Sequence, residues 1–133
     1  MKILFAMHFE PGHHLGTFRL ARTLRSRGHS IAYLGLPRMR KLVENQGFEF
    51  VEFAGHLFSD ASQPPASPTW WQRRSAAETL FRRYLNAIVD GTLDDCLRSA
   101  RPDLLICDSF LWYIAMRGQR LQIPTIQIST SLF

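Results

Sequence analysis

Two histidines near the amino terminus and one aspartate far along the chain are residue types that can perform acid–base chemistry together. His13 and His14 follow an apolar run that ends at His8, and Asp108 follows a second apolar run, Asp103 to Cys107. A carboxylate that accepts a hydrogen bond from one imidazole nitrogen fixes the tautomer and makes the other nitrogen a better base for a hydroxyl group. The residues alone also fit simpler roles, the histidine as a helix cap or surface residue and Asp108 as a helix N-cap.

The segments around these residues are typical of strands in a parallel sheet that is covered on both faces. The predicted strands are Lys2 to His8, Ser30 to Leu36, Phe48 to Phe53, Asp103 to Cys107 and Thr125 to Ser129. Helical patterns separate most of them, which favours right-handed crossover connections. We therefore predict an α/β fold, a Rossmann-like parallel sheet of order 3-2-1-4-5 with helices on both faces.

The predicted helices are marked by apolar spacing and by glycine or proline near their ends. They run from about Leu15 to Gly28, from Pro37 to Gly47, from Ser75 to about Ser99 and from about Phe110 to Arg120. The third begins with a capping box, Ser75 to Glu78, and contains Gly91. The proline-containing segment Ala54 to Arg74 is predicted to be a long loop.

The predicted strand order places the candidate chemical residues at one edge of the sheet. Ligands of open parallel sheets bind outside the carboxyl ends of the strands, at the point where the strand order reverses. In the order 3-2-1-4-5 this point lies between the first and fourth strands, which are followed by His8 to Leu15 and by Asp108 to Leu111. We therefore expect His13 or His14 to meet Asp108.

The composition is that of one globular domain spanning residues 1–133. Apolar residues make up 46% of the chain and charged residues 20%, and no apolar run approaches the roughly 20 residues of a membrane span. We expect a cytoplasmic protein.

Cys96 and Cys107 lack metal-ligand spacing, which predicts reduced cysteines and no metal site. The net charge of +5 comes mainly from arginines, and without a nucleic-acid-binding motif we expect no nucleic-acid partner.

The loop after the first strand contains Gly12 and Gly16, which leave room for a ligand near backbone amides. This loop lacks the Gly-x-Gly-x-x-Gly pattern, and no acidic residue closes the second strand at Gly35-Leu36. A dinucleotide site is marked by both features. The sequence therefore disfavours an NAD-binding domain and predicts no bound cofactor.

Two blocks of the sequence carry a family resemblance. The first is Gly12 to Ile31 (GHHLGTFRLARTLRSRGHSI), and the second is Arg101 to Asp108 (RPDLLICD), followed by Ile123-Pro124-Thr125. The first resembles the opening of UDP-glycosyltransferases, with their Gly-His, Leu-Ala, Leu and Arg-Gly-His signatures. The second resembles the fourth and fifth strands of the same family, and the two blocks stand in the family's order.

The resemblance implies the amino-terminal, acceptor-binding domain of an inverting GT-B glycosyltransferase of the family 1 type. By motif matching, His13 falls on the catalytic base and Asp108 on the carboxylate that supports it. Such an enzyme moves a sugar from a nucleotide sugar to a hydroxyl of a small apolar acceptor, while the histidine takes the hydroxyl proton. Gly16 stands where the family usually has proline, which makes this loop more flexible.

Acceptor contacts are expected from the first loop and from the variable segment Ala54 to Arg83, which corresponds in position to the part of such domains that shapes the acceptor pocket. Aromatic side chains there could stack on a flat apolar acceptor. The expected contacts are Gly12, His14, Trp70, Trp71 and Phe81. Two other interpretations stay open for the aromatic residues: packing over the sheet edge, or contact of the Trp70-Trp71 pair with an anionic membrane surface.

The resemblance also implies a part that this sequence lacks. The family's donor-binding motifs belong to a carboxyl-terminal domain, whereas the sequence stops at Leu132-Phe133, just after a strand. We therefore expect a truncated chain that is inactive alone, with the nucleotide sugar held as co-substrate by that domain or by a separate chain. An exposed apolar surface would also allow a homodimer.

Two further functions stay open at this point. The chain could be a non-catalytic acceptor or scaffold subunit of a two-chain glycosyltransferase. It could also be a flavodoxin-like single domain with a nucleotide or flavin ligand of its own.

Overall fold

The computed structural model describes residues 1–55 and 69–130, and within these ranges it describes the backbone alone at residues 72–77, 80 and 81. Most of the predicted loop Ala54 to Arg74 and the terminal pair Leu132-Phe133 therefore lie outside the described residues, as does the side chain of Phe81. Cys96 and Cys107 are free thiols. Burial raises the pKa of Cys107 to about 12, so this thiol is a protonated core group.

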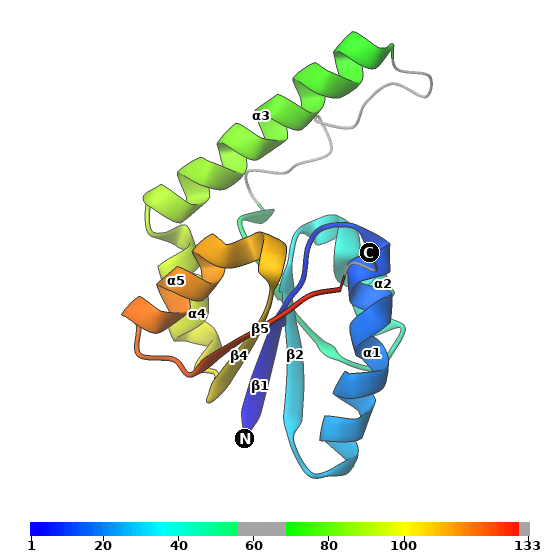
Figure 1. Cartoon of the computed structure of the whole chain (residues 1–133), viewed down its shortest axis with the longest axis vertical. Helices are drawn as coiled ribbons and strands as arrows, with labels where there is room; N and C mark the ends of the chain where they lie inside the picture. The colour runs from blue at the N-terminus through cyan, green and yellow to red at the C-terminus, as the bar shows by residue number, and fades with distance from the viewer. Residues whose placement is uncertain (56–68, 131–133) are drawn as a thin grey trace.

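Five strands form one parallel sheet, as predicted (Figure 1). They are β1 (Lys2–Ala6), β2 (Ser30–Gly35), β3 (Glu49–Glu52), β4 (Leu104–Asp108) and β5 (Thr125–Ile128). Every pairing between neighbouring strands is parallel, and the order is β3-β2-β1-β4-β5. The strand order reverses between β1 and β4, so the predicted switch point is confirmed.

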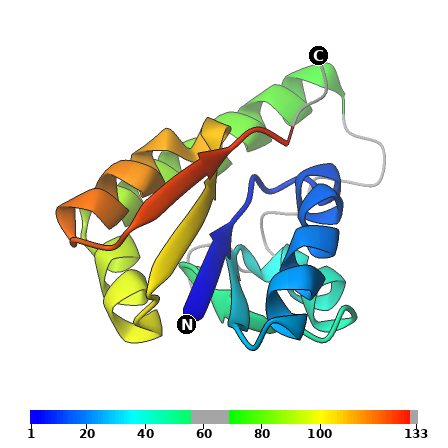
Figure 2. The ribbon, with the colours of Figure 1, turned by 60° about the horizontal axis from the view of Figure 1, so that its bottom comes forward.

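Successive side chains of a strand point to opposite faces, and β1 uses this alternation to hold two apolar cores. Ile3 and Phe5 pack on one face with Phe18, whereas Leu4 and Ala6 contribute to the core on the other face. Figure 2 shows the helices that cover the sheet, with α1 (Pro11–Ser26) and α2 (Arg40–Glu44) on one side. On the other side lie α3 (Trp70–Val89), α4 (Thr92–Ala100) and α5 (Trp112–Arg120). This double cover explains why the three central strands, β1, β2 and β4, consist mainly of buried apolar residues.

Helix α1 begins at Pro11, four residues before the predicted start near Leu15. The prediction placed the residues before Leu15 in a loop, but proline is favoured at the first helical position because its fixed φ suits a helix and its missing N–H loses no bond there. Gly12, His13 and His14 belong to the first turn of a helix, with fixed relative directions, rather than to a loop.

The single helix predicted from Ser75 to about Ser99 is two helices. Helix α3 starts at Trp70, before the predicted capping box, and ends at Val89; α4 starts at Thr92. Gly91 lies between them with φ of 93°, a left-handed conformation that glycine adopts without steric cost. The Asp90 side chain accepts a hydrogen bond of 2.9 Å from the backbone N–H of Thr92 and so supports the new helix start.

Two short 3₁₀ helices complete the fold. They are η1 (Pro37–Met39), which precedes α2, and η4 (Ser109–Leu111), which precedes α5. Gly118 brings α5 close to the sheet, because a Cβ added there would lie 2.8 Å from both Leu105 Cδ2 and Thr125 Oγ1. Across residues 1–55 and 69–130, no helix has the length and apolar character that crossing a membrane requires.

Candidate active site

The candidate site is at the carboxyl edge of the sheet, where β1, β4 and β5 end (Figure 2). His13 comes from the first turn of α1, which follows β1, and Asp108 is the last residue of β4. Thr130 lies two residues beyond Ile128, the end of β5. Parallel strands carry these three segments to one edge although they are far apart in the sequence.

The expected histidine–aspartate contact is present, and His13 makes it. Nδ1 of His13 lies 2.7 Å from Oδ2 of Asp108. The Asp108 side chain is fully buried, whereas 16% of the His13 side chain is exposed. An ionised carboxylate only accepts hydrogen bonds, so Nδ1 must carry a proton and donate it. The neutral ring then keeps its free lone pair on Nε2.

Asp108 accepts hydrogen bonds on both of its oxygens. The backbone N–H of Phe110 donates to Oδ1 at 3.0 Å, while His13 and the Thr130 hydroxyl, at 2.6 Å, donate to Oδ2. Burial by itself raises the pKa of this carboxyl, but the bonds from Thr130, Phe110 and His13 outweigh burial and lower it. The carboxylate is therefore ionised at neutral pH although it is inaccessible to solvent. The predicted N-cap role also holds, because Asp108 caps η4.

Thr130 is the site residue that the sequence did not reveal. Its Oγ1 contacts Nδ1 of His13 as well as Oδ2 of Asp108. The residue type carries no signal by itself, since threonine is common after a strand. The signal that could have found it is positional, because β5 neighbours β4 and ends at the same edge of the sheet.

Two aromatic rings, those of His8 and Phe110, border the His13 imidazole. The His8 ring centroid lies 4.8 Å from that of His13, and Phe110 meets His13 edge-on at 5.7 Å. Burial, followed by the proximity of His13, lowers the pKa of His8, which is therefore neutral at pH 7. Phe110 is 55% exposed. It gives the site an apolar wall beside a polar group.

Two predicted acceptor contacts lie next to His13 in sequence but have different surroundings. Gly12 is exposed, and a Cβ added there would meet no atom within 4 Å, so its contact with an acceptor stays a prediction. His14 is fully buried and stacks on Tyr33 with ring centroids 5.9 Å apart. A direct acceptor contact by His14 stays a prediction, and in this structure its ring faces the core.

The predicted aromatic contacts on α3 are not gathered around His13. Trp70 and Trp71 form the first turn of α3, stack on each other with centroids 3.5 Å apart, and are 59% and 63% exposed. Figure 1 shows that this end of α3 projects away from the sheet. The backbone of Phe81 belongs to the same helix, but its side chain lies outside the described residues. Acceptor binding by these three residues remains a prediction.

One group of described residues has the types that could hold a metal ion. His8, Glu10 and His13 each offer a ligand atom, and these atoms lie within 4.8 Å of one another. On His13 the available atom is Nε2, since Nδ1 is engaged by Asp108. Glu10 is exposed, and a metal here would compete for the lone pair that a base needs. The expectation of a metal-free site stays a prediction.

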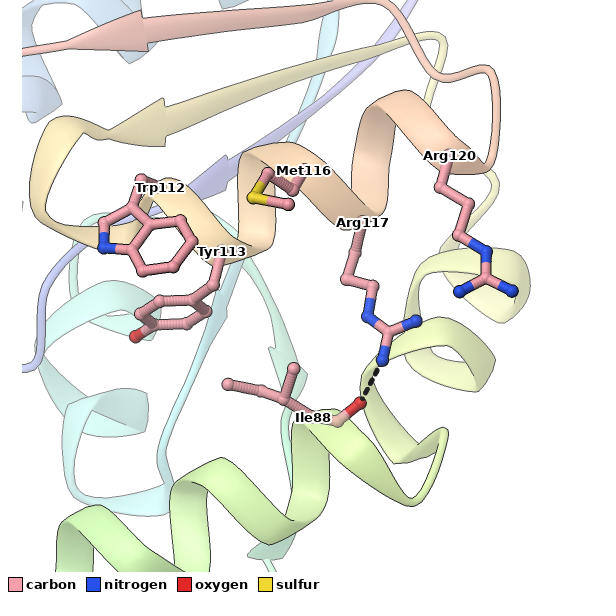
Figure 3. A pocket seen from close by; sticks show the side chains of 6 residues that line it. All are labelled: Ile88, Trp112, Tyr113, Met116, Arg117 and Arg120. Carbon is pink, nitrogen blue, oxygen red and sulfur yellow. Dashed lines mark hydrogen bonds between the residues drawn. The ribbon is translucent and has the colours of Figure 1, made fainter.

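A hollow of about 380 Å³ lies between α5 and the end of α3 (Figure 3). Its lining is mostly from α5: Ile88, Trp112, Tyr113, Met116, Arg117 and Arg120. Among the lining residues, Arg117 donates a hydrogen bond of 2.9 Å to the Ile88 carbonyl and forms an ion pair with Asp94 at 3.5 Å. The lining includes neither His13 nor Asp108, and the sequence did not predict this hollow.

Known structures share this fold, although no protein-family model and no curated protein sequence matches the chain. SnogD, a glycosyltransferase from Streptomyces nogalater, is 26% identical with a TM-score of 0.66. The glycosyltransferase VinC in complex with dTDP is 18% identical, with a TM-score of 0.69. The spinosyn rhamnosyltransferase SpnG complexed with spinosyn aglycone is 17% identical, with a TM-score of 0.64.

The alignments cover nearly all of this chain but only part of each neighbour. They include 98%, 99% and 100% of this chain for SnogD, VinC and SpnG, and 33%, 35% and 35% of those proteins. The chain thus spans about a third of the length of the structures that it matches. Together with the strand order, this likeness shows that the chain has the fold of the amino-terminal domain of the GT-B glycosyltransferases.

Proposed function

We propose that this domain binds the acceptor and supplies the catalytic base of an inverting glycosyltransferase. The contact between His13 and Asp108 carries the proposal. The His13 ring is partly exposed, and its Nδ1 lies 2.7 Å from the buried, ionised carboxylate of Asp108 at the switch point of the sheet. This is the arrangement of a base and its orienting group, and the likeness to glycosyltransferases supports the reaction class.

In the proposed reaction, Nε2 of His13 takes the proton from an acceptor hydroxyl. The acceptor oxygen attacks the anomeric carbon of the nucleotide sugar from the face opposite the leaving group, and a new carbon–oxygen bond forms. The bond from the anomeric carbon to the phosphate oxygen breaks, and the nucleoside diphosphate leaves with its electron pair. Inversion at the anomeric carbon follows from this single displacement.

Asp108 stabilises the imidazolium that forms when His13 receives the proton. The carboxylate is buried, where effective dielectric constants are lower than in water, so its charge acts on the ring with little screening. Its own hydrogen bonds hold it ionised and in place. A general base positioned in this way typically contributes 10²–10⁴-fold to a rate.

The surroundings of His13 favour an acceptor with an apolar body. Exposed Phe110 borders the imidazole, with ring centroids 5.7 Å apart, and no atom lies within 4 Å of a Cβ added at Gly12. A hydroxyl presented to Nε2 could therefore rest its carbon skeleton against the Phe110 ring. Among the structural neighbours, SpnG is complexed with an aglycone, the spinosyn aglycone.

The donor site is proposed to lie mainly on a second domain, in the same polypeptide or in a separate chain. The neighbours are about three times as long as the matched region, and one of them binds dTDP. The exposed edge of the His13 ring would then face the nucleotide sugar across an interdomain cleft. In this proposal the present domain needs no cofactor of its own.

The experiment is to replace His13 by alanine in the longest form of the protein that the gene encodes and to measure sugar transfer. We expect kcat to fall about 10²–10⁴-fold while the circular dichroism spectrum and thermal midpoint change little. His29→Ala is the control, because His29 follows the other end of the same helix, just before β2. Turnover equal to wild type in the His13 variant would contradict the proposal.

A further inference from the structure

The hydroxyl of Thr130 touches both members of the candidate pair. Oγ1 lies 2.6 Å from Oδ2 of Asp108 and within hydrogen-bond distance of Nδ1 of His13. The three side chains come from three separate segments: the first turn of α1, the end of β4 and the residues just after β5. Thr130 is therefore a third member of the cluster rather than a neighbour of one partner.

The hydrogen atoms of the cluster can be placed by elimination. Oδ2 of an ionised aspartate has no proton, so the Thr130 hydroxyl must donate to it. That hydroxyl hydrogen is then unavailable to His13, and the contact between Oγ1 and Nδ1 needs a proton on Nδ1. The Nδ1 proton is thus shared between Oδ2 and Oγ1. Two acceptors enforce one tautomer, which leaves the lone pair on Nε2.

The register of the sheet brings Thr130 to this place. Asp108 pairs with Ile128 across β4 and β5, so the chain needs only two more residues to pass beyond the carboxylate. The hydroxyl then approaches Oδ2 from the β5 side, while the Phe110 amide holds Oδ1. Asp108 is fixed from both sides, and its fixed position sets the direction of the His13 ring.

We infer that Thr130 is a positioning residue that holds His13 in the base-competent tautomer through Asp108. Its expected effect on turnover rests on the proposed function, whereas its effect on the imidazole is independent of it. During proton transfer the hydroxyl also withdraws electron density from Oδ2. The carboxylate is then a weaker competitor for the Nδ1 proton, and the charge stays on the imidazolium.

Thr130→Val removes the hydroxyl and keeps the side-chain shape, and Thr130→Ser keeps the hydroxyl. In the longest encoded form of the protein we expect the valine variant to lose about tenfold in kcat, with the acceptor KM nearly unchanged. The serine variant should stay within about threefold of wild type, since it retains the same bond. Thr125→Val is the matched control, because Thr125 lies at the opposite end of β5 and its hydroxyl donates to the Ile123 carbonyl at 2.8 Å.

Nitrogen-15 NMR of labelled histidine gives a readout that packing alone would not change. We expect wild type and Thr130→Ser to show His13 protonated at Nδ1, and Thr130→Val to show a mixture of tautomers with faster exchange of the Nδ1 proton. An unchanged tautomer and exchange rate in the valine variant would overturn the inference, as would a serine variant as impaired as valine. If His13→Ala retained full transfer, the proposed function would fail, while the tautomer measurement would still decide the role of Thr130.

Discussion

Adjacent residues on the first turn of α1 belong to two different regions of the molecule. His13 lies at the carboxyl edge of the sheet, part exposed, with Asp108 and Thr130 as partners. His14 points into the core between α1 and the sheet, where it stacks on Tyr33 and its Nε2 has no hydrogen-bond partner. Successive residues of a helix are rotated by about 100°, so one side chain reaches the site and the next cannot.

The two imidazole rings have different hydrogen-bond partners in these two environments. In the site, a buried carboxylate holds one ring nitrogen and leaves the other for a ligand. In the core, burial lowers the pKa of His14, and the Glu10 carbonyl, 3.4 Å from Nδ1, is its backbone partner. The partner of a histidine, more than the residue itself, therefore decides whether its ring is suited to catalysis. Variants on each side can test this distinction.

The largest effect is expected from Asp108→Asn. Because the Phe110 N–H needs an acceptor at the Oδ1 position, the new amide NH₂ would fall at Oδ2 and face Nδ1 of His13. The proton would move to Nε2, and we expect kcat to drop about 10³–10⁴-fold, as for a serine-protease triad whose aspartate is made asparagine. Steady-state kinetics with a thermal-unfolding control measure this.

Asp103→Asn is the matched control for that experiment. Asp103 lies just before β4, at the opposite end of the strand from Asp108, and its carboxylate accepts a hydrogen bond of 2.6 Å from the Lys2 backbone N–H. It carries the same change in charge without touching the imidazole. A loss of turnover in the Asp103 variant equal to that in the Asp108 variant would show that the effect is electrostatic over the whole domain. The assignment of Asp108 would then be wrong.

A smaller effect, of a different kind, is expected from His14→Ala. Removing a buried ring leaves a cavity beside Tyr33, and we expect the free energy of unfolding to fall by about 2 kcal/mol. His14→Phe keeps the ring volume and removes the unpartnered Nε2, so it should retain most of the stability. Urea unfolding measures both. A fully folded His14→Ala protein with turnover as low as that of Asp108→Asn would instead make His14 a ligand contact.

The sequence was sufficient to predict the strand order of the sheet and the contact between a histidine and Asp108. Short apolar strands with helices between them leave few possible topologies, and parallel strands must bring their carboxyl ends together. It could not choose between His13 and His14 from the residues, since that choice depends on where α1 begins. Proline at the first helical position sets that start, and only the family resemblance singled out His13 beforehand.

Thr130 and the α3 tryptophans show two further reasons for failure. Thr130 reaches the site through the register of β5 on β4, a long-range property that the local sequence does not encode. Trp70 and Trp71 were placed in a loop because prolines precede them, yet they form the first turn of α3. Short-range sequence patterns therefore predict strands and helix caps better than they predict where the side chains after those elements lie in the folded protein.

The smallest effect is expected from Tyr33→Phe, and it concerns the core side of the comparison. The Thr17 hydroxyl donates to the His14 carbonyl at 2.8 Å, so the Tyr33 hydroxyl, 3.0 Å away, donates to Thr17. Losing this bond should lower the free energy of unfolding by about 1 kcal/mol at pH 7. Burial raises the pKa of Tyr33 from 10.0 to about 12, which makes the effect depend on pH.

Between pH 10 and pH 12 the unfolded chain loses the Tyr33 proton while the folded protein keeps it. The folded state then binds more protons, and its stability falls by up to about 1.4 kcal/mol per pH unit from this group. Tyr84 and Tyr113 add slopes of the same sign, because burial raises the pKa of each. Tyr33→Phe should therefore make the alkaline loss of stability shallower, as measured by urea unfolding at several pH values. An unaltered slope in the phenylalanine variant would mean that Tyr33 titrates normally, and that the core beneath His14 is wetter than its burial implies.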